Sequence, residues 1–191
     1  MTGIDYTVDA CERCPDLVAN RSRIVNGVGS GRAGIVFVGE APGADEDERG
    51  EPFVGRSGEI LTEKLADRDL ARDDVRITNT VRCRPPENRD PYVGERANCH
   101  DYLAAELATY DPAVVCSLGR IPTHELLGRS PTLGDVVGER FTDVLAETVG
   151  VDAVLVPCYH PAAMLYDRSR EDDIDRVLDD VVALAGAGGD G

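Results

Sequence analysis

Four cysteines in this chain are spaced as metal ligands often are. Cys11 and Cys14 form a C-x2-C pair, 68 residues then precede Cys83, and 15 more separate it from Cys99. Thiolates at such positions are typical of tetrahedral zinc sites and of iron–sulfur clusters. Because zinc ribbons usually contain two close pairs, the spacing favours an iron–sulfur cluster, although it leaves zinc open. The alternative is a surface redox pair with the other two cysteines in the core.

Three polar side chains follow apolar segments that resemble strands. Glu40 comes directly after "IVFVG", where a carboxylate can orient water. Asn79 ends "VRITN", and its amide offers both a donor and an acceptor to a planar edge. His160 follows "AVLVPCY" and can donate a hydrogen bond to charge that develops on a substrate. The alternatives are an asparagine that only forms a turn and a histidine that only satisfies backbone groups.

The segment "GEAPGADEDERGEPFVGRSG" leads from the first of these strands to a helical pattern. Phe53 lies in it between glycines, either as a plug for the loop or as a stacking surface for a flat ligand. Glu46 and Asp47 follow Glu40 in a loop that can fold back toward His160. Most other acids of the segment are expected to form a solvated face. His100 and His124 have no comparable surroundings, and we expect them to be structural.

Alternating strands and helices must position these residues. Continuous apolar runs, typical of strands buried on both faces, occur at 35–38, 75–79, 113–118 and 153–159. Helical patterns occur at 57–68 with Ser57 as cap, from Pro91 onward, at 122–127 and at 171–185, and segment 134–150 suggests a β excursion with a short helix. This order predicts an α/β fold with a central, mainly parallel four-stranded sheet and helices on both faces. Ligands of such sheets bind outside the carboxyl ends of the strands, so Glu40, Asn79 and His160 should surround one cleft.

We expect one domain over residues 1–185 and a flexible tail at 186–191. No segment approaches the roughly 20 apolar residues of a membrane span, and the N-terminus lacks the pattern of a signal peptide. These features predict a cytoplasmic protein without a membrane anchor. In that setting metal ligands or free thiols are favoured over disulfides. Cys116 and Cys158 lie inside apolar strands and are expected in the core.

The charge balance is strongly acidic. The 36 acidic residues, 22 of them Asp, face 19 Arg and a single Lys, so the formal net charge is −16. An acidic surface with so little lysine favours adaptation to high salt, where screening removes most self-repulsion. The alternative is an ordinary acidic protein from a GC-rich genome, which also favours Asp and Arg.

Together these motifs resemble the family 4 uracil-DNA glycosylases, the iron–sulfur group of archaea and thermophilic bacteria. The resemblance runs from Cys11 to about Met164 through C-x2-C, GEAPGADED, GEPFVGRSG, TNTVRCRPPENRDP, Cys99, SLG and YHPAAML. It implies a three-layer αβα sandwich and a hydrolase that removes uracil from DNA and so starts base excision repair. It also implies a [4Fe–4S] cluster on Cys11, Cys14, Cys83 and Cys99. With the acidic composition, it suggests a halophilic archaeon as the source.

The same resemblance implies roles for the residues of the cleft. The catalytic residues would be Glu40, which orients water, and His160, which faces the uracil carbonyl beside the breaking bond, with Glu46 as its support. Phe53 would stack on the base, and Asn79 would read its edge. The uracil-binding residues implied in this way are Glu40, Ala41, Pro42, Phe53, Asn79 and His160.

The expected partner is uracil-containing DNA, double- or single-stranded, bound by a monomer. Arginines near the predicted cluster loop are the candidate phosphate contacts: Arg82, Arg84, Arg89 and Arg96. Met164 or Leu165 is a candidate wedge for the vacated base stack. Two other functions use the same residues. One is an iron–sulfur electron-transfer or redox-sensing protein, and the other is a non-catalytic binder of uracil-containing DNA.

Overall fold

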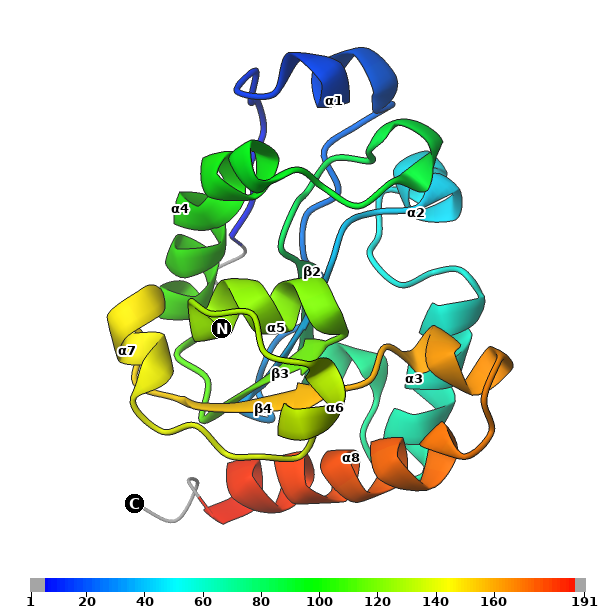
Figure 1. Cartoon of the computed structure of the whole chain (residues 1–191), viewed down its shortest axis with the longest axis vertical. Coiled ribbons are helices and arrows are strands. Elements are labelled where there is room, and N and C mark those ends of the chain that lie inside the picture. The colour runs from blue at the N-terminus through cyan, green and yellow to red at the C-terminus, as the bar shows by residue number, and fades with distance from the viewer. Residues whose placement is uncertain (1–5, 188–191) are drawn as a thin grey trace.

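A four-stranded parallel sheet forms the centre of the computed structural model, which describes residues 6–187 (Figure 1). The strands are β1 (Ile35–Gly39), β2 (Arg76–Asn79), β3 (Val114–Leu118) and β4 (Val154–Cys158), in the spatial order β2-β1-β3-β4. Gly39 aligns with Asn79, and Leu118 aligns with Cys158. The carboxyl ends of the strands therefore meet at one edge, and the four predicted strands are confirmed.

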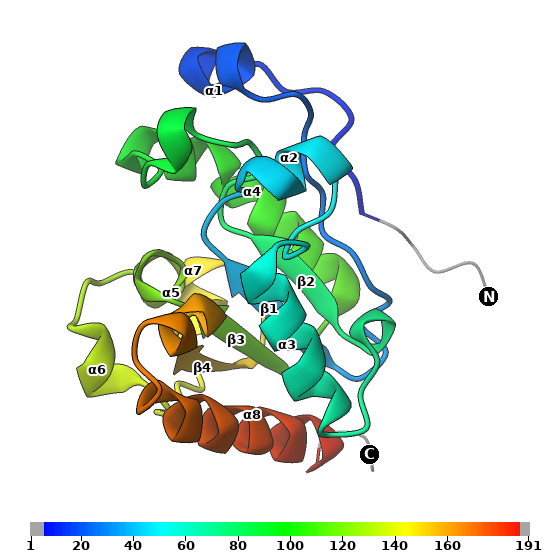
Figure 2. The same ribbon diagram turned by 90° about the vertical axis from the view of Figure 1, so that its right-hand side faces the viewer.

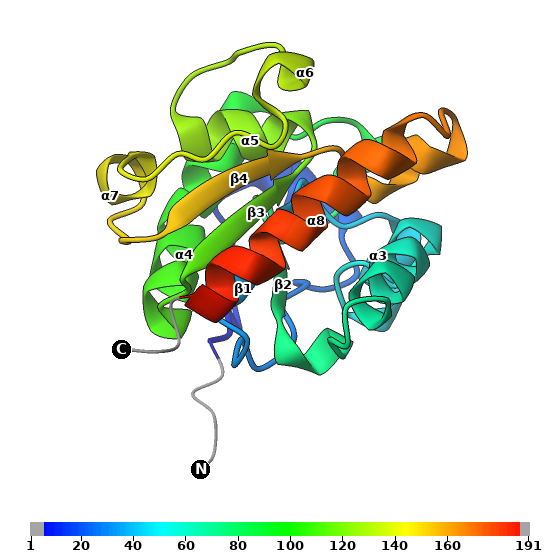
Figure 3. The same ribbon diagram turned by 90° about the horizontal axis from the view of Figure 1, so that it is seen from below.

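Helices cover both faces of the sheet, which confirms the three-layer αβα arrangement. On one face, α3 (Arg56–Ala66) and α8 (Arg170–Ala187) pack apolar side chains against β1 and its neighbours, and Figure 3 shows α8 running across that face. On the other face lie α4 (Val93–Tyr110), α5 (Arg120–Leu127) and α7 (Val144–Thr148). Alternate residues of β1 point into the two cores, Phe37 into the first and Val36 into the second.

Shorter elements complete the described part of the chain. These are α1 (Pro15–Asn20), α2 (Ala44–Arg49), α6 (Leu133–Val136) and the 3-10 helices η1 (Arg72–Asp74), η2 (Pro86–Asn88) and η3 (Pro161–Leu165). Figures 1 and 2 show α1 and α2 at the end of the molecule opposite α8. Within residues 6–187, no helix is both long enough and apolar enough to cross a membrane.

Three helices begin at other residues than their patterns predict. The N-cap of α3 is Gly55, so Ser57 lies inside the first turn and is not the cap. Helix α4 begins at Val93, two positions after Pro91, with Tyr92 as its N-cap. Helix α5 begins at Arg120, directly after Gly119, and this early start brings Arg120 to the edge where β3 ends.

The short helix α2 was not predicted, because its sequence ADEDER contains no apolar stripe. Its stability comes from its ends. Three acids occupy its first turn, where they complement the helix dipole, and Gly50 ends it in the left-handed conformation at φ 82°.

In segment 134–150 the predicted β excursion is reduced to an isolated bridge between Phe141 and Leu155. Helix α8 continues to Ala187, two residues past the predicted helix end at residue 185 and into the predicted tail, and residues 188–191 lie outside the described residues.

A buried ionic network joins β2 to α4. Glu106 is fully buried, and its carboxylate accepts hydrogen bonds from Arg76 Nε at 2.8 Å, Arg82 Nη2 at 2.6 Å and Thr78 Oγ1 at 2.7 Å. Both arginines are also buried. The network fixes the residues that follow Asn79, and so it holds the start of the loop that contains Cys83.

We predict that Glu106→Ala lowers the free energy of unfolding by about 3–5 kcal/mol, because it leaves two buried guanidinium groups without their carboxylate. Urea unfolding followed by circular dichroism measures the loss. Asp101→Ala is the matched control on the same helix, because the Asp101 side chain is 80% exposed and its ion pair with Arg13 is 3.7 Å long. The control should change stability by less than about 1 kcal/mol. Equal effects of the two substitutions would contradict the role assigned to the network.

Candidate active site

A pocket of about 200 Å³ opens at the carboxyl edge of the sheet. Its lining residues come from segments that are distant in sequence and are Glu40, Ala41, Gly43, Glu46, Phe53, Ser57, Asn79 and His160. The structure thus brings together nearly all of the residues that the sequence points to. Pro42 is buried next to the pocket but does not line it, and Ser57 is a lining residue that sequence reasoning missed.

Close packing at the end of β1 sets the shape of this pocket. A Cβ atom on Gly39 would lie 2.4 Å from Asn79 Oδ1 and 2.5 Å from Phe53 Cε2, so only glycine fits between the amide and the ring. Phe53 has a positive φ of 55°, and its ring stacks beside the His160 ring with centroids 5.5 Å apart. A Cβ on Gly58 would likewise overlap the Phe53 carbonyl oxygen, at 1.7 Å. The glycines of the segment therefore allow close approach to the aromatic ring.

Glu46 holds the segment that carries Phe53. Its Oε2 accepts a hydrogen bond from the Gly43 amide at 3.1 Å, and its Oε1 accepts from the amides of Val54 and Gly55, both at 3.2 Å. One carboxylate thus ties the start of α2 to the residues that follow Phe53. No hydrogen bond joins Glu46 to His160 within the described residues, and the carboxylate acts on the imidazole only through its charge, so the predicted support stays a prediction.

His160 is placed to act as a neutral donor. Its Nδ1 accepts a hydrogen bond from the Ala162 amide at 3.2 Å, so in the neutral ring the proton is on Nε2. Burial lowers the pKa of His160, and the nearby Glu46 carboxylate opposes this shift without overcoming it. At neutral pH the side chain therefore offers one N–H donor without carrying a charge.

Asn79 is 4% exposed, and among the described residues its side-chain amide has no hydrogen-bond partner. Among the described residues its amide atoms are not fully buried, so water in the pocket can reach them. This amide lines the pocket, so a ligand with one acceptor and one donor on the same edge would satisfy it. Phe53 supplies an apolar ring for the face of such a ligand.

Glu40 lies at the rim, and its pKa is raised to about 7. Burial is the largest cause, and the carboxylate of Asp90 adds to it, while Arg120 and Arg96 act in the opposite direction. Sequence reasoning missed Asp90 and Arg120. For Arg120 a signal was present, because it follows a glycine at the end of a strand just as Glu40 does.

The four predicted metal-binding cysteines lie near α1 and α4. Cys14, Cys83 and Cys99 are buried in one small cluster with Leu17 and Val81, and Cys11 is half-buried. Arg21 donates to Cys83 Sγ at 2.8 Å, and Asn98 donates to Cys14 Sγ at 3.3 Å.

Burial raises the pKa of Cys83 and raises that of Cys99 to about 11, so without a metal both thiols keep their protons at neutral pH. Hydrogen bonds to sulfur and a dry surrounding suit thiolate ligands, and a metal would displace these protons. Within residues 6–187, however, no three His, Cys, Asp or Glu side chains are grouped closely enough to hold a metal ion. The metal site therefore stays a prediction. Cys116 and Cys158 are fully buried in β3 and β4, as expected.

The arginines predicted to contact DNA differ in how far their side chains are exposed and in whether they are already paired. Arg82 is 2% exposed and paired with Glu106, so the structure does not support it as a phosphate contact. Arg84 and Arg89 remain partly exposed, although Arg89 forms a bidentate pair with Glu95 at 2.7 and 2.8 Å.

The two candidate wedge residues lie in η3. Met164 packs against the core, whereas Leu165 is 38% exposed and the next residue, Tyr166, is 90% exposed. Leu165 is therefore better placed than Met164 to insert into DNA.

His100 bonds to Glu125 and to the Thr148 carbonyl, and His124 bonds to the Pro131 carbonyl, which agrees with structural roles.

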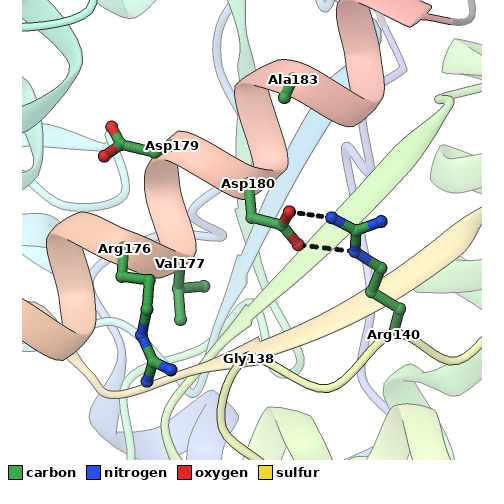
Figure 4. A pocket seen from close by; sticks show the side chains of 7 residues that line it. All are labelled: Gly138, Arg140, Arg176, Val177, Asp179, Asp180 and Ala183. Carbon is green, nitrogen blue, oxygen red and sulfur yellow. Dashed lines mark hydrogen bonds and ion pairs between the residues drawn. The ribbon is translucent and has the colours of Figure 1, made fainter.

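A larger hollow of about 460 Å³ lies elsewhere, between α8 and residues 138–140. Figure 4 shows that Arg140 reaches across it to Asp180, while Arg176 extends along its side. Its charged groups already have ion-pair partners, Arg140 with Asp180, Arg176 with Asp173 and Asp179 with Arg68, and no strand ends there. This hollow exceeds the pocket at the sheet edge in volume, but its residues offer no chemistry comparable to that of the pocket.

The pocket of this α/β fold presents an aromatic ring, an amide and a neutral imidazole, groups that suit a flat ring with polar edges. Residues 27–182 match the family model of the uracil DNA glycosylase superfamily. The chain is 44% identical to a type-4 uracil-DNA glycosylase of Archaeoglobus fulgidus over 161 residues, 82% of this chain and 79% of that protein. It is equally identical to the type-4 enzyme of Pyrobaculum aerophilum, over 81% of this chain and 79% of that protein. A type-5 enzyme of Thermus thermophilus is 34% identical over 63% of this chain and 69% of that protein. The chain belongs to the uracil DNA glycosylase superfamily and is similar to its type-4 members.

We predict that His160 titrates at a lower pH than an exposed histidine and is neutral, with its proton on Nε2, at pH 7. Nitrogen-15 NMR of the imidazole distinguishes the tautomers, and a His124→Gln variant helps to assign the signals. A proton on Nδ1, or a midpoint above that of a model histidine, would contradict this account.

Proposed function

We propose that this protein is a monofunctional uracil-DNA glycosylase, which flips uracil out of DNA and hydrolyses its N-glycosidic bond. The observation that carries the proposal is the convergence of Phe53, Asn79 and His160 on one pocket in a chain of this superfamily. Flipping is the general strategy of enzymes that act on a base in DNA, glycosylases among them.

Recognition of uracil follows from the pocket. The base stacks on the Phe53 ring, and the Asn79 amide pairs with uracil O4, an acceptor, and N3–H, a donor. Cytosine presents a donor and an acceptor at those two positions. An amide held in one orientation therefore pairs with uracil and leaves cytosine with unpaired polar groups.

Cleavage of the N-glycosidic bond leaves opposite charges on the base and the sugar, and His160 and Glu40 each stabilise one of them. The electrons of the broken bond remain on uracil, while the sugar becomes cationic. His160 donates its Nε2–H to the uracil carbonyl beside that bond, and one such donor contributes about 3–4 kcal/mol in the transition state. Ionised Glu40 favours the cationic sugar and orients a water whose oxygen bonds to the anomeric carbon, and the proton that this water loses neutralises the uracil anion. No covalent nucleophile is needed.

We propose further that Cys11, Cys14, Cys83 and Cys99 hold a [4Fe–4S] cluster. Two donors to sulfur, Arg21 and Asn98, and the buried surroundings support this assignment. When bound, the cluster would cross-link the N-terminal segment to the loop after β2 and to α4, with redox chemistry as an added capacity.

DNA binding by so acidic a protein requires contacts beyond charge. Contacts to about four phosphates would lose roughly 3–4 decades of affinity in a tenfold rise of salt. Stacking on Phe53 and insertion of Leu165 would then carry more of the binding, with Arg84, Arg89 and Arg96 as local phosphate contacts. We propose that the single-domain protein works as a cytoplasmic monomer on double- or single-stranded DNA, in a halophilic organism.

We predict that the purified protein releases free uracil from uracil-containing DNA and that His160→Ala slows this release by about 10²–10³-fold, since it removes a transition-state donor. Single-turnover assays in high and in low salt measure the rate. His124→Gln is the control and should retain activity, and circular dichroism checks that both variants fold. Unchanged activity of His160→Ala would overturn the assigned role, and binding of uracil-containing DNA without turnover would favour a non-catalytic binder.

We predict that anaerobically purified protein contains about four iron and four sulfide ions per chain and that Cys83→Ser lowers this content. Metal analysis and visible absorption measure it, with Cys116→Ser as the control that retains the cluster. One zinc ion per chain would contradict the assignment. A cluster that cycles at a physiological potential in a chain without uracil release would favour a redox protein.

A further inference from the structure

Two charged residues that sequence reasoning missed meet at the rim of the pocket. Arg120 is the first residue of α5, directly after the exit of β3, and Asp90 lies in the segment between Cys83 and Cys99. Arg120 Nη2 and Asp90 Oδ2 are 2.6 Å apart, and both side chains are more than half exposed. The pair therefore bridges two strand exits, and water and salt can reach it.

The bridge lies beside Glu40. Strands β1 and β3 are neighbours with Val38 beside Ser117, so Glu40 and Arg120 leave adjacent strands at the same edge of the sheet. Asp90 is paired with Arg120 at this edge, and its negative charge disfavours the ionised form of Glu40, whereas Arg120 and Arg96 favour it. Burial of Glu40 strengthens the effect, since it disfavours the charged form.

The segment that carries Asp90 is held firmly. The preceding residue, Arg89, forms a bidentate pair with Glu95 and donates to the Asp90 carbonyl oxygen at 3.0 Å. The following residue, Pro91, is buried, and its ring restricts the backbone. Asp90 is thus presented to Glu40 by a fixed piece of chain, even though its own side chain is exposed.

We propose that Asp90 and Arg120 are positioning residues that act through Glu40, with opposed charges that set the pH range in which Glu40 is ionised and uracil is released. The inference rests on the proposed function and assigns these two residues to that same site. It also links the loop of the predicted metal site to the reaction centre.

The expected direction follows from the charges. Glu40 has a raised pKa, so it is protonated below about pH 7 and ionised above it. Because the ionised form orients water and favours the cationic sugar, activity should rise with pH through this range. Removing Asp90 lowers the pKa of Glu40 and moves the rise to lower pH. Removing Arg120 raises that pKa and moves the rise to higher pH.

The test is the pH dependence of single-turnover uracil release with enzyme in excess, at fixed ionic strength, for wild type, Asp90→Asn and Arg120→Gln. Near pH 6, the normalised rate of Asp90→Asn should exceed that of wild type by up to about 5-fold, and the normalised rate of Arg120→Gln should fall below that of wild type by up to about 10-fold, as expected for midpoint shifts of up to about one pH unit. Rates are normalised to each enzyme's high-pH plateau. Asp101→Asn and Arg129→Gln are the controls, because they make the same changes in net charge at other exposed positions.

Repeating both substitutions in a Glu40→Gln variant separates an electrostatic effect on Glu40 from a structural effect. In Glu40→Gln the titrating group is gone, so the rise near pH 7 should disappear and neither substitution should shift the remaining profile. Shifts in the same direction, no shifts, or shifts that persist in Glu40→Gln would overturn the inference while wild type still releases uracil. If wild type releases no uracil at any pH, the proposed function fails instead.

Discussion

The parallel direction of all four strands is the constraint on which the site depends. It brings the ends of β1, β2, β3 and β4 to one edge, and each exit then contributes a group to the pocket or its rim. Glu40 follows β1, Asn79 ends β2, Arg120 follows β3 and His160 follows β4. A side chain placed at a strand exit needs no long loop to reach the substrate, so the sheet itself sets the relative positions of these groups.

The glycine-rich segment after β1 is explained by close packing. Gly39 leaves room for the Phe53 ring and the Asn79 amide, and Gly58 leaves room for the Phe53 carbonyl. Among its many acids, Glu46 has a specific task, because its carboxylate accepts three backbone hydrogen bonds and so fixes the Phe53 loop. Glu46 therefore stabilises the conformation of this segment, although in the sequence it is one of many acidic residues.

The strands and the residues at their ends could be predicted from the sequence, whereas helix α2 and the ion pairs between distant segments could not. The strands are buried on both faces, so they appear as apolar runs, and the rule that ligands bind at strand ends then placed Glu40, Asn79 and His160 together. Helix α2 was missed because it has no apolar face. Arg82 resembles a surface arginine in the sequence, because its partner, Glu106, is 24 residues away and only the fold brings the two together. The contact between Asp90 and Arg120 has the same character, since it joins two segments through side chains alone.

The central claim is that Phe53, Asn79 and His160 form a binding site for one pyrimidine. A crystal structure of the protein with free uracil tests it most directly. The account predicts that the base stacks on Phe53, with the Asn79 amide at O4 and N3 and His160 Nε2 at the carbonyl beside N1. Uracil bound instead in the hollow beside α8, or held in the pocket without contacts to these three side chains, would contradict it.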